Sequence, residues 1–164
     1  MSSTEPSPDT RMPSGVRRLV RHLGPELLVV DRVPHTGDLV FTTKNTEALA
    51  EALVDVFRNP DADDALSLQA ALLLGRGKKL IPLEYVLPAL APLLIEEDEG
   101  ASRWAAVALD AAARTGDSER LPKQPSDPAM SLRRIAEQFP EHSDLVDDIV
   151  KHWNREGYRR IETS

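Results

Sequence analysis

Apolar side chains recur every three or four residues over most of the chain after residue 44, and charged residues fill many of the positions between them. This spacing places the apolar residues on one face of an α-helix, so it predicts a series of amphipathic helices. Capping residues, prolines and glycines mark their ends. The predicted helices cover residues 45–59, 63–74, 82–94, 101–114, 128–139 and 143–154.

Glycine and proline give two of these helices particular features. Gly75 and Gly77 are expected to end the helix that covers residues 63–74. Because that helix is apolar nearly all round, we expect it to lie between other layers. Pro88 and Pro92 are expected to bend or break the next helix, since each removes a backbone donor and clashes with the preceding turn.

The chain before residue 45 follows a different pattern. One short helix is predicted first, with an apolar face formed by Val16, Leu19, Val20 and Leu23, and Gly24-Pro25 ends it. Two β-branched runs, 27–33 and 39–43, then flank the turn-forming segment 34–38, which predicts a β-hairpin. A lone hairpin is marginally stable in water, so we expect it to pack against helices or against a partner.

An internal repeat connects residues 48–75 with residues 86–113. In each stretch an apolar helix ends in an acidic turn, and a second helix with a double alanine follows, Ala70-Ala71 or Ala105-Ala106. The period is about 35 to 38 residues, which is the length of one helical-pair unit in repeat proteins. Double alanines allow adjacent helices to approach closely, and the acidic turn complements the N-terminal dipole of the second helix.

The second stretch carries the segments Leu87-Pro88-Ala89-Leu90, Glu97-Asp98-Glu99 and Arg103-Trp104-Ala105-Ala106-Val107-Ala108-Leu109. With these features the chain resembles the HEAT-repeat family of stacked helical pairs. The resemblance covers residues 83–117 and 46–77 and is only topological for 128–156; Pro92 and Trp104 depart from the usual pattern. It implies a mainly α fold, a short stack of antiparallel helix pairs in an α-α superhelix, to which the N-terminal hairpin is added. A generic helical bundle is the alternative.

These patterns predict one helical-repeat domain over residues 15–157. A disordered tail, 1–14, is expected to precede it, and a loose tail, 158–164, to follow it. Within the domain we expect a helix plus hairpin cap at 15–44, two helical pairs at 45–117, a linker at 118–127 and a terminal helical pair at 128–157.

Composition narrows the possible functions. The chain has 164 residues, 27 acidic and 20 basic side chains, a formal net charge of −7 and no cysteine. The absence of cysteine excludes thiolate metal sites, thiol catalysis and disulfides. The acidic balance disfavours a dominant nucleic-acid or anionic-membrane binder, because phosphates repel a net anion. No apolar stretch approaches the ~20 residues of a membrane helix, and we expect a soluble, cytoplasmic protein.

The sequence lacks several common catalytic and nucleotide-binding motifs. No HExxH, GxSxG, GxGxxG or complete phosphate-loop motif is present. Asp144, Asp148 and His152 share one helical face and are the only candidates for a metal site, but a solvated polar face explains them better. We therefore expect no enzymatic activity, no metal and no cofactor.

HEAT-like arrays are mostly protein-binding scaffolds, so the resemblance implies a non-catalytic interaction or adaptor module, as a subunit or accessory factor of a larger assembly. Arginines and exposed aromatics dominate the energetics of protein interfaces. The candidate contact residues are Arg76, Tyr85, Arg103 and Trp104, although Trp104 on this pattern also suits a core position.

The alternative is a nucleic-acid-associated regulator that uses the C-terminal helix pair and the basic tail. Two basic clusters could contact phosphates: Arg17, Arg18 and Arg21 near the N-terminus, and Lys151, Arg155, Arg159 and Arg160 near the C-terminus. Acidic residues at the start of the last helix, Asp144, Asp147 and Asp148, would meet phosphates unfavourably. A protein partner is therefore preferred.

Overall fold

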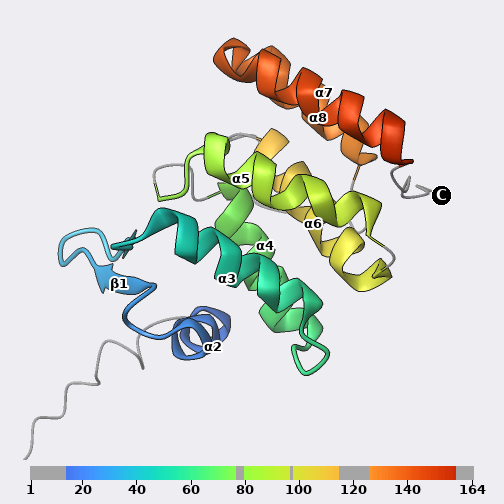
Figure 1. Ribbon diagram of the computed structural model, residues 1–164. Helices are drawn as coiled ribbons and strands as arrows, with labels where there is room; N and C mark the ends of the chain where they lie inside the picture. Colours follow the sequence, from blue (N-terminus) through green and yellow to red (C-terminus); the bar gives the residue numbers. More distant parts are fainter. Residues whose placement is uncertain (1–13, 77–79, 97, 115–125, 158–164) are drawn as a thin grey trace, which may run out of the picture.

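The computed structural model describes residues 14–76, 80–96, 98–114 and 126–157 (Figure 1). A mainly α fold with a two-stranded N-terminal hairpin, as predicted, is confirmed. Of the predicted tails, 158–164 and all of 1–14 except Ser14, which begins a helix, lie outside the described residues, as does most of the predicted linker. The elements are α2 (Ser14–Leu23), β1 (Val29–Arg32), β2 (Leu39–Thr42), α3 (Thr46–Arg58), α4 (Asp64–Arg76), α5 (Leu83–Leu90), the 3-10 helix η1 (Ala91–Ile95), α6 (Glu99–Ala113), α7 (Pro128–Gln138), the 3-10 helix η2 (Pro140–His142) and α8 (Ser143–Glu156).

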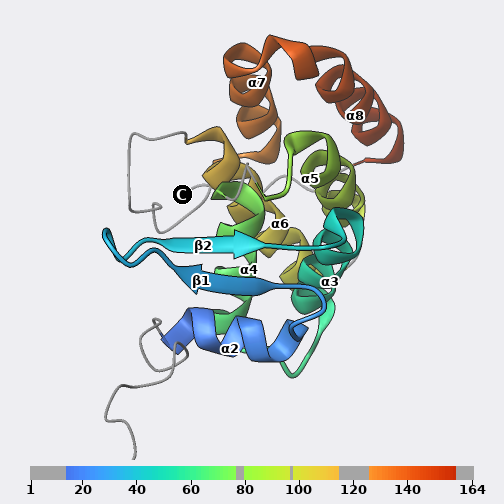
Figure 2. The ribbon, with the colours of Figure 1, turned by 90° about the vertical axis from the view of Figure 1, so that its left-hand side faces the viewer.

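The α-helices form two layers, which Figure 2 shows from the side. One layer contains α2, α4, α6 and α7, each packed against the next. The other contains α3, then α5 with η1, then α8. Helices α3 and α4 form one pair across the layers, and α5–η1 and α6 form the next. In the terminal pair the order is reversed, because α7 packs on α6 and α8 packs on α5 and η1.

Local capping explains where several helices begin. The side chain of Asn45 accepts a 3.0 Å hydrogen bond from the backbone nitrogen of Ala48 at the start of α3. Asp63, Asp98 and Asp127 cap α4, α6 and α7 in the same way, because their carboxylates accept hydrogen bonds of 2.9, 3.0 and 2.9 Å from backbone nitrogens. These contacts satisfy backbone donors that a helix leaves free in its first turn.

The predicted end of this helix at residue 74 is wrong by two residues, because α4 continues through Gly75 to Arg76; Gly77, the other predicted stop, lies outside the described residues. Gly75 lies inside α4, buried against α6. A Cβ atom at Gly75 would come within 2.5 Å of the carbonyl oxygen of Ala108 and 2.6 Å of the Cβ of Ala111. The glycine is thus a packing residue, which allows two helices to cross more closely than any other residue would permit.

The two prolines of the third predicted helix act differently from each other. Helix α5 continues through Pro88 and ends at Leu90, and the chain then tightens into η1 with Pro92 in its first turn. Pro88 is exposed, so water can donate a hydrogen bond to the backbone carbonyl oxygen that a proline leaves without a donor one turn earlier. The predicted disruption therefore occurs at Pro92, as a change from α to 3-10 geometry.

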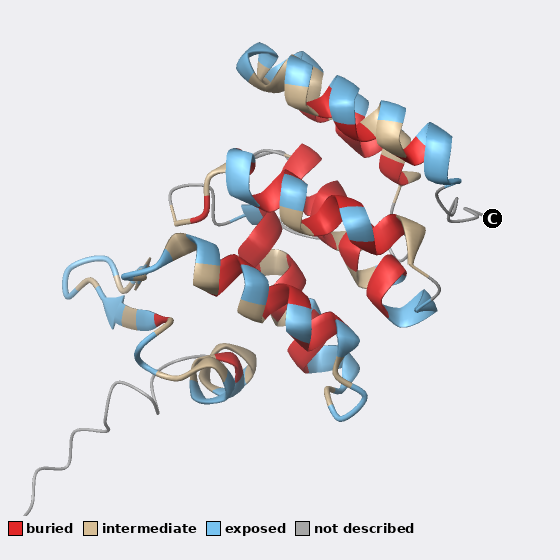
Figure 3. Ribbon diagram, in the orientation of Figure 1, coloured by how far each residue is buried: buried red, intermediate tan, exposed pale blue. Residues whose placement is uncertain are grey.

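The core lies between the two layers, as Figure 3 shows. Helix α6 is buried over most of its surface, and it packs against both α4 and α7. The hairpin pairs Val30 with Phe41, and both side chains pack against the core. Its opposite face leaves Val29 and Val40 exposed.

Candidate protein-interaction groove

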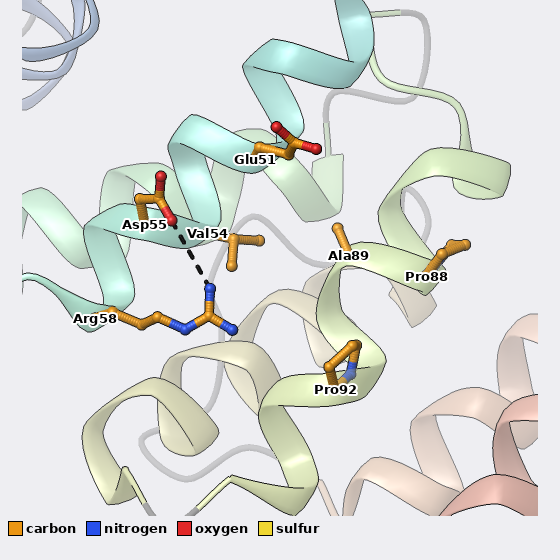
Figure 4. Close-up of a pocket in the computed structure, with 7 residues that line it drawn as sticks. All are labelled: Glu51, Val54, Asp55, Arg58, Pro88, Ala89 and Pro92. Atoms are coloured by element: carbon orange, nitrogen blue, oxygen red, sulfur yellow. Dashed lines mark ion pairs between the residues drawn. The ribbon is translucent and has the colours of Figure 1, made fainter.

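A hollow of about 340 Å³ opens between α3 and the α5–η1 segment, on the layer that ends at α8 (Figure 4). We call it the α3–α5 groove. Its size is near the lower end of natural binding pockets. The residues that line it are Glu51, Val54, Asp55, Arg58, Pro88, Ala89 and Pro92.

Helix α3 supplies an apolar floor and an acidic rim. Val54 belongs to the buried face of α3 and is 4% exposed. Glu51 and Asp55 are exposed and lie four residues apart, which places both carboxylates on one side of the helix. The side chain of Glu51 forms no ion pair or hydrogen bond with another described residue, and it is exposed to solvent at the groove.

The opposite wall is apolar. Pro88 and Pro92 are also four residues apart, and both are exposed, with Ala89 half-buried between them. Neither proline has a backbone N–H. This wall therefore presents rings and a methyl group beside the carboxylates of α3, as Figure 4 shows.

Arg58 closes one end of the groove and is held by Glu96. The Nε of Arg58 donates a 3.2 Å hydrogen bond to one carboxylate oxygen of Glu96, and Nη2 donates to the other. Asp55 lies 3.8 Å from Nη1. The hydrogen bond to Glu96 raises the pKa of Arg58 above its ordinary value, and the charges of Glu96, Asp55 and Asp98 act in the same direction against partial burial.

The opening of the groove therefore carries a net negative charge. Among the described residues, the carboxylates of Glu51 and Asp55 line the groove and that of Glu96 contacts the guanidinium of Arg58. Glu96 engages Arg58 through both oxygens, whereas Asp55 is only a distant neighbour. The exposed carboxylate of Glu51, and that of Asp55 beyond its 3.8 Å contact with Arg58, can therefore attract an external cation.

The predicted protein-contact residues lie elsewhere and on three helices. Arg76 is the exposed last residue of α4, beside the C-terminal half of α6, and Tyr85 is 42% exposed in the first turn of α5. Arg103 is exposed near the start of α6, about 12 Å along the helix from Ala111. Trp104 is half-buried and packs against the core. These four residues therefore do not form one compact patch.

The two predicted basic clusters lie at opposite ends of the fold. Arg17, Arg18 and Arg21 belong to α2, whereas Lys151 and Arg155 belong to α8 (Figure 1). Arg18 forms a 2.9 Å ion pair with Asp63, and the Nε of Arg17 is buried. Arg159 and Arg160 lie outside the described residues. The described part of the chain thus offers no continuous basic surface that joins the clusters.

Asp144, Asp148 and His152 do lie on one helix, α8, as the sequence predicts. Among the described residues, no group of three or more histidine or acidic side chains is arranged to hold a metal ion. A second hollow, of about 490 Å³, is lined in the described part of the chain by Asp148, Lys151, Asn154 and Arg155. All four come from α8: one carboxylate, one amide and two basic groups on a single helix.

The sequence alone predicts some features of the residues that line the groove. The spacing of Glu51 and Asp55 predicts a charged outer face on α3, and the spacing of Pro88 and Pro92 is visible in the chain. Nothing local indicates that these two pairs lie opposite each other. Nor does the sequence pair Arg58 with Glu96, which is 38 residues away.

None of the described helices has the length and apolar character needed to cross a membrane. Comparison of the chain with protein-family models, with curated proteins and with solved structures found no match. The resemblance to HEAT repeats therefore stays a prediction from the sequence.

Proposed function

We propose that this protein is a non-catalytic interaction module, an adaptor or accessory subunit that binds a segment of a partner protein in the α3–α5 groove. The observation that carries this proposal is the combination of an apolar floor and wall with an open acidic rim. Apolar surface supplies binding energy, and a few polar groups at its edge fix orientation.

The residues of the groove favour binding over catalysis. The described side chains that line it include two exposed carboxylates, an arginine engaged by Glu96, and apolar groups. Glu51 and Asp55, the lining residues that could act as general base, are both exposed to solvent, whereas catalytic carboxylates are usually tuned by burial. The separation of the basic clusters on α2 and α8 further favours a protein partner over a nucleic acid.

A selection from a random peptide library tests the proposed function. The whole protein is immobilised, enriched peptides are synthesised, and each is titrated into ¹⁵N-labelled protein. We expect the amide resonances of Glu51, Val54, Asp55 and Ala89 to shift, with little change in α7. Failure to enrich any peptide, or shifts confined to another surface, would contradict the proposal.

A further inference from the structure

We propose that the α3–α5 groove selects a short extended segment that carries two arginines separated by one residue. This inference rests on the proposed function and specifies the chemistry of the partner. Three properties of the groove support it: its size, the spacing of its carboxylates and the nature of the wall that faces them.

The size of the groove limits what can enter it. A volume of about 340 Å³ accommodates a few side chains of a peptide, and it is too small for a helix about 10 Å in diameter to enter over its length. An extended segment that lies along the groove, parallel to α3, can insert alternate side chains, because successive side chains of an extended chain point to opposite faces.

The spacing of the two exposed carboxylates of α3 matches alternate residues of such a segment; Glu51 is unpaired among the described residues, and Asp55 has only the 3.8 Å contact with Arg58. Glu51 and Asp55 are four residues apart on α3, which corresponds to about 6 Å along a helix axis. Residues two apart in an extended chain are about 6.6 Å apart. Two side chains that point the same way can therefore reach Glu51 and Asp55 at once.

The wall opposite α3 selects arginine among the basic residues. An arginine has a long apolar stem and a planar head that can donate two parallel hydrogen bonds to a carboxylate. Its stem would cover the rings of Pro88 and Pro92 while its head reaches a carboxylate across the groove. Arg58 engages Asp55 only through a 3.8 Å contact, because Glu96 holds its guanidinium through two hydrogen bonds.

The peptide Gly-Ser-Gly-Arg-Ala-Arg-Gly-Ser-Gly, blocked at both ends, is the probe for this proposal. We expect it to shift the amide resonances of Glu51, Asp55 and Ala89 in ¹⁵N-labelled full-length protein. A matched peptide with glutamine in place of both arginines should bind at least about tenfold more weakly, because it lacks the charge-assisted hydrogen bonds. Affinity for the arginine peptide should fall as salt rises from about 50 mM to about 500 mM.

Charge reversal in the groove provides the matched test on the protein. Glu51→Lys should weaken the arginine peptide about tenfold or more, because like charges then face each other. Glu137→Lys makes the same change at an exposed position of α7 and should leave the affinity within about twofold. Circular dichroism spectra of both variants should match that of the unaltered protein, since both positions are exposed.

The possible outcomes separate this inference from the proposed function. If the glutamine peptide binds the groove as tightly as the arginine peptide, the selectivity for arginine is wrong while peptide binding in the groove stands. Equal weakening by Glu51→Lys and Glu137→Lys would likewise overturn the inference, because the attraction would come from overall charge. If library-selected peptides also leave the groove resonances unchanged, the proposed function itself is contradicted.

Discussion

The indole Nε1 of Trp153 donates a 2.8 Å hydrogen bond to the carbonyl oxygen of Ala91, across 62 residues of sequence. Trp153 lies near the end of α8 and is 1% exposed, and Ala91 lies where α5 becomes η1. The contact joins the terminal helix pair to the layer that contains the groove. It also satisfies the polar atom of a buried indole, which otherwise would cost stability.

Replacement of Trp153 by phenylalanine should destabilise the protein by about 1–3 kcal/mol, because the Ala91 carbonyl loses its buried donor. Chemical unfolding monitored by circular dichroism measures the change. Asn154→Ala, at the next and exposed position of α8, should alter the free energy of unfolding by less than about 0.5 kcal/mol. Equal effects of the two substitutions would show that the hydrogen bond contributes nothing measurable.

Gly75→Ala should be destabilising, in contrast to most such substitutions within helices. Alanine normally stabilises a helix by about 0.5–1 kcal/mol relative to glycine. At Gly75 the added methyl group would lie 2.5 Å from the Ala108 carbonyl oxygen, and the forced separation of α4 and α6 should cost about 1–3 kcal/mol.

Gly100→Ala is the matched control, because the nearest atom to its added Cβ is the carboxylate oxygen of Asp98 at 3.4 Å. This substitution at the exposed start of α6 should be neutral or stabilising by up to about 1 kcal/mol. Thermal unfolding of both variants provides the comparison. A stabilising effect of Gly75→Ala would mean that the helix crossing is looser than the structure shows.

The ion pair between Arg58 and Glu96 should contribute more than the neighbouring pair between Arg58 and Asp55. Glu96 contacts the guanidinium through two oxygens and its side chain is 31% exposed, whereas the Asp55 side chain is 74% exposed and 3.8 Å away. Double-mutant cycles with Arg58→Gln, Glu96→Gln and Asp55→Asn should give coupling energies of about 1 kcal/mol and below about 0.5 kcal/mol, respectively. The reverse order would contradict the proposed engagement of Arg58 by Glu96.

The contact between Arg18 and Asp63 should make stability depend on acid pH. The hydrogen bond from Arg18 and that from the backbone of Leu66 lower the pKa of Asp63 below the ordinary aspartate value. A lowered pKa in the folded state contributes stability that is present above about pH 4 and is lost as the pH falls through the folded value.

The variants Asp63→Asn and Arg18→Gln test this dependence. Asparagine can still cap α4 but carries no charge, so Asp63→Asn should reduce the loss of stability below about pH 4. Arg18→Gln should return the pKa of Asp63 towards the ordinary value, as measured by NMR titration of the carboxyl carbon. An unchanged titration midpoint in Arg18→Gln would rule out the ion pair as the principal cause.

Local sequence patterns were sufficient for the helices themselves. The capping residues Asn45 and Asp127 and the apolar spacing behind them predict where α3 and α7 begin, because a cap and an amphipathic stripe act within a few residues of each other. The turn-forming segment 34–38 similarly predicts the hairpin, whose register pairs Val29 with Thr42.

Packing between distant segments controls the remaining features. Gly75 looks like a helix end until α6 is placed against it, and the reversed order of α7 and α8 depends on contacts with α6 and with Ala91. The groove exists because α3 and α5 lie side by side, which brings the carboxylates of one helix to the prolines of the other. The spacing of apolar residues determines which face of each helix is buried. Which other helix packs against that face depends on the shapes and hydrogen bonds of segments far apart in the chain.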